Sequence, residues 1–189
     1  LILPADTAWG EADGAARALP IPLRAALAAD AVKAAARVLA KREPTYLILA
    51  DVATRGRSLE LAGRIAAKTG CKLTLEYNNA RLERGAGRVT PERTPYAVDP
   101  AVAMFKDTRH VVLVGAPVPV SFFAYPGKPS VHIPPGCTVT ELGGPDADLE
   151  AALDALAEEL GARNTAPAHV AAFAPPALPS GGALAQEGI

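Results

Sequence analysis

Side chains that could hold a ligand follow three short apolar runs, each with the composition of a buried strand. Five such residues come just after these runs or at their ends: Arg55, Gly56, Glu76, Gly115 and Ala116. Where parallel strands end, an arginine and main-chain amides can bind a phosphate, and an acidic side chain can accept a hydrogen bond from a ribose hydroxyl. These five residues are therefore the candidates for cofactor binding.

The loops themselves carry only part of a nucleotide-binding pattern. The first loop reads DVATRGR, with one glycine where a dinucleotide-binding loop has GxGxxG, so its main chain forms a poor cradle for a pyrophosphate. For Glu76, a solvent-exposed charge at the end of a strand is the favoured interpretation. Gly85 and Gly87 lie between Arg84 and Arg88 but do not follow a strand directly, and a solvated or subunit-contacting loop is favoured there.

No group of residues has the spacing of a catalytic or metal centre. The histidines His110, His132 and His169 are scattered, without cysteine or acidic neighbours at ligand spacing. No serine lies in a G-x-S-x-G turn, and neither Cys71 nor Cys137 has a recognisable histidine partner. The sequence therefore predicts no catalytic residue and no metal site within this chain.

The elements that must position the candidates alternate between helix and strand. Helices are expected over residues 31–42, 58–69, 100–105 and 148–160, and strands over 46–50, 71–77, 110–114, 130–133 and 138–142. Asp30 and Asp99 are expected as helix N-caps, and Gly70 as the residue that ends the second helix. Two βα units in succession favour a parallel sheet with right-handed crossovers. The predicted fold is an α/β, Rossmann-like, doubly wound sheet of five to six mostly parallel strands with helices on both faces.

Irregular segments surround and interrupt this pattern. Residues 1–10 indicate the tail of a strand followed by a turn, and residues 11–29 a connector interrupted by prolines. Residues 78–98 form a long basic excursion, and residues 163–189 have the proline, alanine and glycine content of a linker. The chain begins inside a strand-like run without methionine, so we expect it to be a piece of a longer polypeptide.

Composition excludes several classes of partner. A net charge of -1 gives no electrostatic reason to expect nucleic acid or an anionic membrane. No apolar run reaches the roughly 20 residues that cross a bilayer. Two distant cysteines fit a reducing compartment, so a cytoplasmic location is expected.

The sequence resembles thiamine-diphosphate-dependent enzymes, in particular the acetolactate synthase large subunit-like group. The opening LILPADTAWGEA is similar to the last strand of that family's pyrimidine-binding domain. The run YLILADVATRGRSLELAGRIAAKTGCKLTLEYNNARLERGAGR resembles the first two βα units of the central domain. The most specific stretch is RHVVLVGAPVPVSFFAYPGKPSVHIPPGCTVTELG, and the end, LPSGGALAQEGI, resembles the linker to the diphosphate-binding domain.

The resemblance implies a domain organisation and a role. Residues 1–10 would belong to the pyrimidine-binding domain, 11–29 to a linker, 30–162 to the central domain and 163–189 to a second linker. The glutamate that activates the cofactor and the Gly-Asp-Gly motif that holds Mg²⁺ and the diphosphate would lie outside this chain. The implied parent enzyme decarboxylates or ligates a 2-keto acid as a homodimer or homotetramer. This chain would space the cofactor-binding domains and catalyse nothing alone.

A nucleotide-binding module for FAD, ADP or NAD is the alternative. True acetolactate synthases hold FAD in the central domain, and some relatives hold ADP or a coenzyme A nucleotide. The sequence departs from the FAD pattern in the first loop, in Pro117-Val118-Pro119 after Gly115-Ala116, and in Pro134-Pro135 after the run that ends at Ile133. A decarboxylase or lyase relative without a tightly bound flavin fits equally well.

Overall fold

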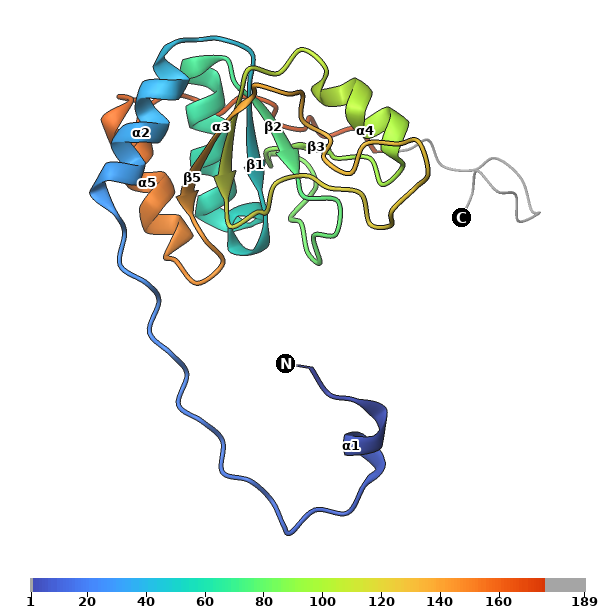
Figure 1. The fold of residues 1–189 in the computed structure, drawn as a ribbon. Coiled ribbons are helices and arrows are strands. Elements are labelled where there is room, and N and C mark those ends of the chain that lie inside the picture. Colours follow the sequence, from blue (N-terminus) through green and yellow to red (C-terminus); the bar gives the residue numbers. More distant parts are fainter. Residues whose placement is uncertain (1, 176–189) are drawn as a thin grey trace, which may run out of the picture.

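The computed structural model describes residues 2–175. Their elements run in this order: α1 (Ala5–Trp9), α2 (Ala29–Ala40), β1 (Thr45–Leu49), the 3-10 turn η1 (Asp51–Thr54), α3 (Gly56–Thr69), β2 (Lys72–Leu75), β3 (Glu92–Arg93), α4 (Val98–Phe105), β4 (His110–Val114), β5 (Thr138–Gly143) and α5 (Leu149–Glu159). Figure 1 shows α1 apart from the sheet, joined to α2 by an extended segment. None of the helices described could cross a membrane, because none is both long and apolar enough.

The sheet has five parallel strands in the order β3-β2-β1-β4-β5. Leu47 in the central strand β1 pairs with Leu73 of β2 on one side and Val112 of β4 on the other. The chain thus builds the sheet outward from β1 in one direction and then from β4 in the other. This order is the doubly wound one, with its switch point between β1 and β4, and the predicted fold class is confirmed.

Helices cover both faces of the sheet. Helices α2, α3 and α5 pack on one face, and α4 lies on the other (Figure 1). Strands β1 and β4 are buried along their whole length, which explains why they are continuous apolar runs in the sequence. The larger apolar cluster contains Leu47, Leu153 and Leu156, and the smaller one centres on Phe105.

Several local predictions are wrong. The start of the chain is not a strand tail, since residues 5–9 form the short helix α1. Asp30 and Asp99 lie in the first turns of α2 and α4, and the cap positions belong to Ala28 and Ala97. Each predicted cap thus lies two residues after the observed one. An acidic side chain in the first turn still interacts favourably with the helix dipole.

The strands also differ from the predictions. Thr74 of β2 is buried, and its hydroxyl lies 3.1 Å from that of Thr94. Residues 130–133 form no strand of the sheet, and Val131 makes only an isolated antiparallel bridge to Val120. Within the basic excursion, residues 92–93 form the short edge strand β3. Gly70 is left-handed and ends α3, as predicted. At the start of α5 the Asp148 side chain accepts a hydrogen bond from the Ala151 amide.

The segment after α5 returns to the body of the domain. The Ala168 amide donates to the Gly63 carbonyl of α3, at 2.9 Å. The Ala171 amide donates to the Arg88 carbonyl, also at 2.9 Å, so this segment pairs with the basic excursion. The expected linker is therefore packed against the fold up to this point, and residues 176–189 lie outside the described part.

Candidate functional site

The switch point of the sheet lies where β1 and β4 end side by side. After β1 the chain enters η1, and Asp51 takes a left-handed conformation with φ 48°. The Asp51 amide donates to Asn79 Oδ1 at 3.1 Å, and the Thr54 hydroxyl donates to the Arg81 carbonyl at 2.6 Å. These two hydrogen bonds hold the turn after β1 against the loop after β2. A 3-10 turn occupies the position where a glycine-rich phosphate loop would stand.

At the same edge Gly115 brings β4 close to α5. A Cβ at Gly115 would lie 2.5 Å from Leu149 Cδ1 and 3.4 Å from the Ala50 carbonyl oxygen, and the residue has φ 67°. The Gly115 amide donates to the Gly143 carbonyl at 2.8 Å. The glycine is therefore required by packing within the protein, because helix and strand leave no room for a side chain.

A large cleft, with a volume of about 620 Å³, lies beside the start of α3. Its charged lining side chains are Arg24, Arg55, Arg57, Glu83, Asp148, Glu150 and Asp154. The acidic groups outnumber the guanidinium groups by one, and several are already paired with each other. A diphosphate gains little from such a lining, because its charges would face carboxylates as well as arginines.

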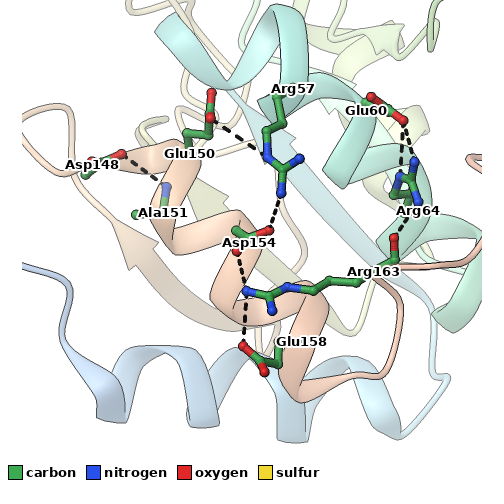
Figure 2. Close-up of polar contacts among 9 residues, drawn as sticks. All are labelled: Arg57, Glu60, Arg64, Asp148, Glu150, Ala151, Asp154, Glu158 and Arg163. Carbon is green, nitrogen blue, oxygen red and sulfur yellow. Dashed lines mark hydrogen bonds and ion pairs between the residues drawn. The ribbon is translucent and has the colours of Figure 1, made fainter.

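One wall of the cleft is an ion-pair network between α3 and α5 (Figure 2). Arg57 reaches Asp154 at 2.7 Å and Glu150 at 3.9 Å. Arg163 also contacts Asp154, and pairs with Glu158 at 3.1 Å. Partial burial alone would raise the pKa of the Asp154 carboxyl, but hydrogen bonds from the two guanidinium groups outweigh this and hold its pKa below the usual range. The network fastens two helices together.

The structure brings two of the five candidate residues together. Arg55 and Gly56 both line the large cleft, and Arg55 lies 3.4 Å from Asp51 in an ion pair. Glu76 lines none of the principal clefts, and its carboxylate accepts a hydrogen bond from the Asn78 amide at 2.9 Å. The Glu76 side chain thus stabilises its own turn.

The remaining two candidates, Gly115 and Ala116, lie on opposite faces of the sheet. Gly115 is used for packing against Leu149, and Ala116 lies against the smaller apolar cluster on the face covered by α4. Neither residue lines the large cleft. Of the five candidates, a nucleotide bound at the switch point would therefore contact only one arginine, Arg55. No acidic side chain among them is placed to accept a hydrogen bond from its ribose.

Sequence reasoning missed most of the cleft. Arg24 comes from the connector before α2, and its guanidinium donates to the Ala147 carbonyl at 3.1 Å, 123 residues along the chain. Asp148 and Asp154 come from the last helix region. These residues come from segments far apart in the sequence, so no local spacing could have predicted that they line the same cleft. The acidic residues of α5 can be read from the sequence, but their neighbours in the fold cannot.

Two histidine pairs lie away from the cleft. His110 Nε2 lies 2.7 Å from Glu43 Oε2, and this hydrogen bond is the main reason why the pKa of Glu43 is lowered. His132 Nε2 lies 3.1 Å from the Ser121 hydroxyl, which is also 3.0 Å from the Pro129 carbonyl. Since the hydroxyl donates to that carbonyl, His132 donates to Ser121 in turn, and this order suits a structural hydrogen bond better than a general base.

Residues 2–175 contain no group of three or more histidine, cysteine, aspartate or glutamate side chains placed to hold a metal ion. The turn after β1 and the mixed charge of the cleft do not fit a tightly held flavin or ADP diphosphate.

Comparison with known proteins identifies the relatives of the chain. No family model matches it. The chain is 44% identical over 181 residues to the Mycobacterium tuberculosis protein named "Putative acetolactate synthase large subunit IlvX". The match covers 96% of this chain and 34% of that protein, so the chain spans about a third of the length of the curated relative it matches.

Two solved structures share the fold. One is described as a "putative thiamin diphosphate-dependent enzyme" from Mycobacterium smegmatis, with TM-score 0.58 and 18% identity, over 82% of this chain and 33% of that one. The other is a thiamine diphosphate-dependent 4-hydroxybenzoylformate decarboxylase from Rhodococcus jostii RHA1, with TM-score 0.54 and 16% identity, over 90% of this chain and 33% of that one. The predicted resemblance to thiamine-diphosphate-dependent enzymes of the acetolactate synthase large subunit-like group is thereby confirmed.

Proposed function

From this resemblance, we propose that the chain is the central domain, with adjoining connectors, of a thiamine-diphosphate-dependent enzyme acting on a 2-keto acid. The observation that carries the proposal is the 44% identity over nearly the whole chain to one third of an acetolactate synthase large subunit-like protein. Decarboxylation or carboligation is the reaction class. The bound cofactor would supply the nucleophilic carbon and the electron sink for that chemistry.

The role of this domain in the proposed enzyme is spacing and assembly. Residues 2–175 contain no group of three or more histidine, cysteine, aspartate or glutamate side chains placed to hold a metal ion. They do supply a rigid platform, since β1 and β4 are buried and α3 and α5 are joined by ion pairs. Thiamine diphosphate and Mg²⁺ would be held by the other domains, and homo-oligomerisation of the whole enzyme is part of the proposal.

The nucleotide-binding alternative has less support. The cleft beside α3 carries more carboxylates than guanidinium groups, and Gly115 serves packing against α5. A nucleotide that binds the folded state at 100 times its dissociation constant would stabilise it by about 2.7 kcal/mol. We expect no such rise in thermal stability on addition of FAD, ADP or NAD.

The direct test is a decarboxylation assay with a panel of 2-keto acids. The complete polypeptide encoded by the gene should release CO₂ only when thiamine diphosphate and Mg²⁺ are both present. Release that is equally fast without the cofactor would show that the proposed chemistry is wrong.

A further inference from the structure

Two clefts at the carboxyl edge of the sheet share one arginine. The first, here called the aromatic cleft, has a volume of about 450 Å³ and is lined by the rings of Tyr77, Tyr96 and Phe122. The second, here called the arginine cleft, has a volume of about 400 Å³ and is lined by Arg84. Arg93, the last residue of β3, lines both clefts. Ligands of α/β sheets bind at this edge, in clefts of roughly 300 to 1,000 Å³.

The rings of the aromatic cleft come from three separate loops, after β2, β3 and β4. The centroids of Tyr77 and Tyr96 lie 5.8 Å apart, with the ring planes at 69°. Those of Tyr96 and Phe122 lie 6.0 Å apart, with the planes at 42°. Tyr96 is 53% exposed and Phe122 54%, so large parts of both rings face solvent. A flat aromatic ligand would meet both ring faces and ring edges here, and either contact attracts it.

The charge lining the two clefts has one sign. Within the described ranges, no aspartate or glutamate lines either cleft. Arg84 and Arg93 form no ion pair within residues 2–175. Glu92, the neighbour of Arg93, lies by Tyr46, where burial raises the pKa of the tyrosine hydroxyl and Glu92 raises it further. Tyr46 belongs to the face covered by α4, so the Glu92 carboxylate does not compete with an anion bound at Arg93.

Hydrogen bonds fix the walls of the clefts before any ligand arrives. Arg93 Nη2 donates to the Tyr77 carbonyl at 3.0 Å, which positions the guanidinium and leaves its other N–H groups to a ligand. The Thr94 amide donates to the Leu75 carbonyl at 3.2 Å, and the Ser121 amide beside Phe122 donates to the Ser130 carbonyl at 2.8 Å. A site with preorganised walls loses little conformational entropy when a ligand binds.

The donors available select the kind of anion. A planar guanidinium matches a carboxylate, which accepts two parallel hydrogen bonds from it. A polyphosphate is bound instead by several main-chain amides or by a helix N-terminus. Pro91 lines the arginine cleft and Pro95 the aromatic cleft, and neither has an amide hydrogen to donate. The combination of rings and guanidinium therefore favours a ligand with one aromatic ring and one carboxylate.

We propose that the two clefts together bind an aromatic carboxylate, with its ring among Tyr77, Tyr96 and Phe122 and its carboxylate on Arg93. Arg84, in the arginine cleft, adds a second positive charge that attracts the same anion. The inference concerns a site on this chain's own sheet edge. It goes beyond the proposed thiamine-diphosphate chemistry and does not depend on it.

The test is calorimetric titration of phenylacetate into the 189-residue chain at low ionic strength. Phenylacetate should bind saturably, with a dissociation constant below about 1 mM. Phenylacetamide has the same ring without the charge, and acetate has the charge without the ring. Each should bind at least roughly tenfold more weakly than phenylacetate, because each lacks one of the two contacts.

Variants assign the binding to the named residues. Arg93→Gln should weaken phenylacetate binding roughly tenfold or more and leave phenylacetamide binding unchanged, since only the charge-assisted contact is lost. Phe122→Ser should weaken the binding of both. Arg81→Gln is the matched control, because Arg81 is an exposed arginine of the same excursion and lines neither cleft. Circular dichroism should show the same fold for all four proteins.

Three results would overturn the inference. The first is a wild-type chain that shows no saturable binding of phenylacetate. The second is an affinity for phenylacetate that is unchanged in Arg93→Gln and Phe122→Ser, or lowered equally in Arg81→Gln, because the named clefts would then not be the site. The third is tighter binding of AMP than of phenylacetate, which would assign the clefts to a nucleotide. The titrations contain no thiamine diphosphate, so the decarboxylation assay decides the proposed reaction separately.

Discussion

Gly115 shows how one residue fixes the distance between a strand and a helix. Two separate features of Gly115 disfavour any other residue type. Its φ of 67° is left-handed, and a Cβ at this position would lie 2.5 Å from Leu149 Cδ1. We predict that Gly115→Ala destabilises the protein by about 2 to 4 kcal/mol, measured by chemical denaturation.

The variant Gly127→Ala measures the cost of a left-handed φ alone, without the steric contact that Gly115→Ala adds. Gly127 has φ 73° but open space around its Cβ position, so this variant should lose only about 1 kcal/mol from backbone strain. Equal losses in the two variants would show that contact with Leu149 contributes nothing.

His132 should make stability depend on pH. Burial lowers the pKa of its ring below the usual value, so the unfolded chain binds the proton more readily than the native one. Stability should therefore fall as the pH drops below about 6.5, by up to about 1.4 kcal/mol for each unit by which the pKa is lowered. His132→Gln should flatten this part of the curve of unfolding free energy against pH.

His169→Gln is the control for that experiment, since His169 is exposed. The control should retain the wild-type dependence on pH. A His132→Gln curve as steep as that of the wild type between pH 7 and 5 would contradict the account of the buried ring.

At the scale of elements, the ion pairs between α3 and α5 should stabilise the helix packing modestly. Asp154 contacts both Arg57 and Arg163, yet its side chain is partly exposed, so solvent screens the interaction. We predict that Asp154→Asn costs roughly 1 kcal/mol at low salt and less at high salt.

The pH dependence of Asp154 follows from its lowered pKa. Its contribution is present above about pH 4, the unfolded-state value, and is lost as the pH falls through the lower native pKa. Wild type and Asp154→Asn should therefore converge in acid. Glu159→Gln, on the same helix but without an ion pair among the described residues, should match the wild type throughout.

The face covered by α4 depends on one large side chain. Phe105 is fully buried and meets Tyr46 of β1 edge to face, with ring centroids 5.0 Å apart. Phe105→Ala should cost about 3 to 5 kcal/mol in thermal or chemical unfolding. Phe173→Ala removes an exposed ring, and its effect should stay within about 0.5 kcal/mol.

Elements buried on both faces were the easiest to predict. The runs that became β1 and β4 are apolar without interruption, and their strand bounds agree with prediction to within a residue. The edge strand β3 has only two residues, and its pairing with β2 comes from tertiary contact rather than from its own composition. The two acidic residues expected as caps fit the first turn of a helix as well as its cap, so their exact position could not be fixed.

At the scale of the whole molecule, the site was less predictable than the fold. Arg55 and Gly56 were chosen because they follow a strand, and they do line the principal cleft. Arg24 and Asp154 reach the same cleft from distant segments, and only the folded chain brings them there. The aromatic residues after β4 were visible in the sequence as FFAY, but their exposure could not be deduced from it.

We propose that this chain is one domain of a thiamine-diphosphate-dependent enzyme and that the cofactor is held by the other domains. The most direct test is calorimetric titration of thiamine diphosphate with Mg²⁺ into the isolated chain and into the complete polypeptide that its gene encodes. We expect saturable binding to the complete polypeptide and none to the isolated chain. Saturable binding to the isolated chain, or none to the complete polypeptide, would contradict the proposal.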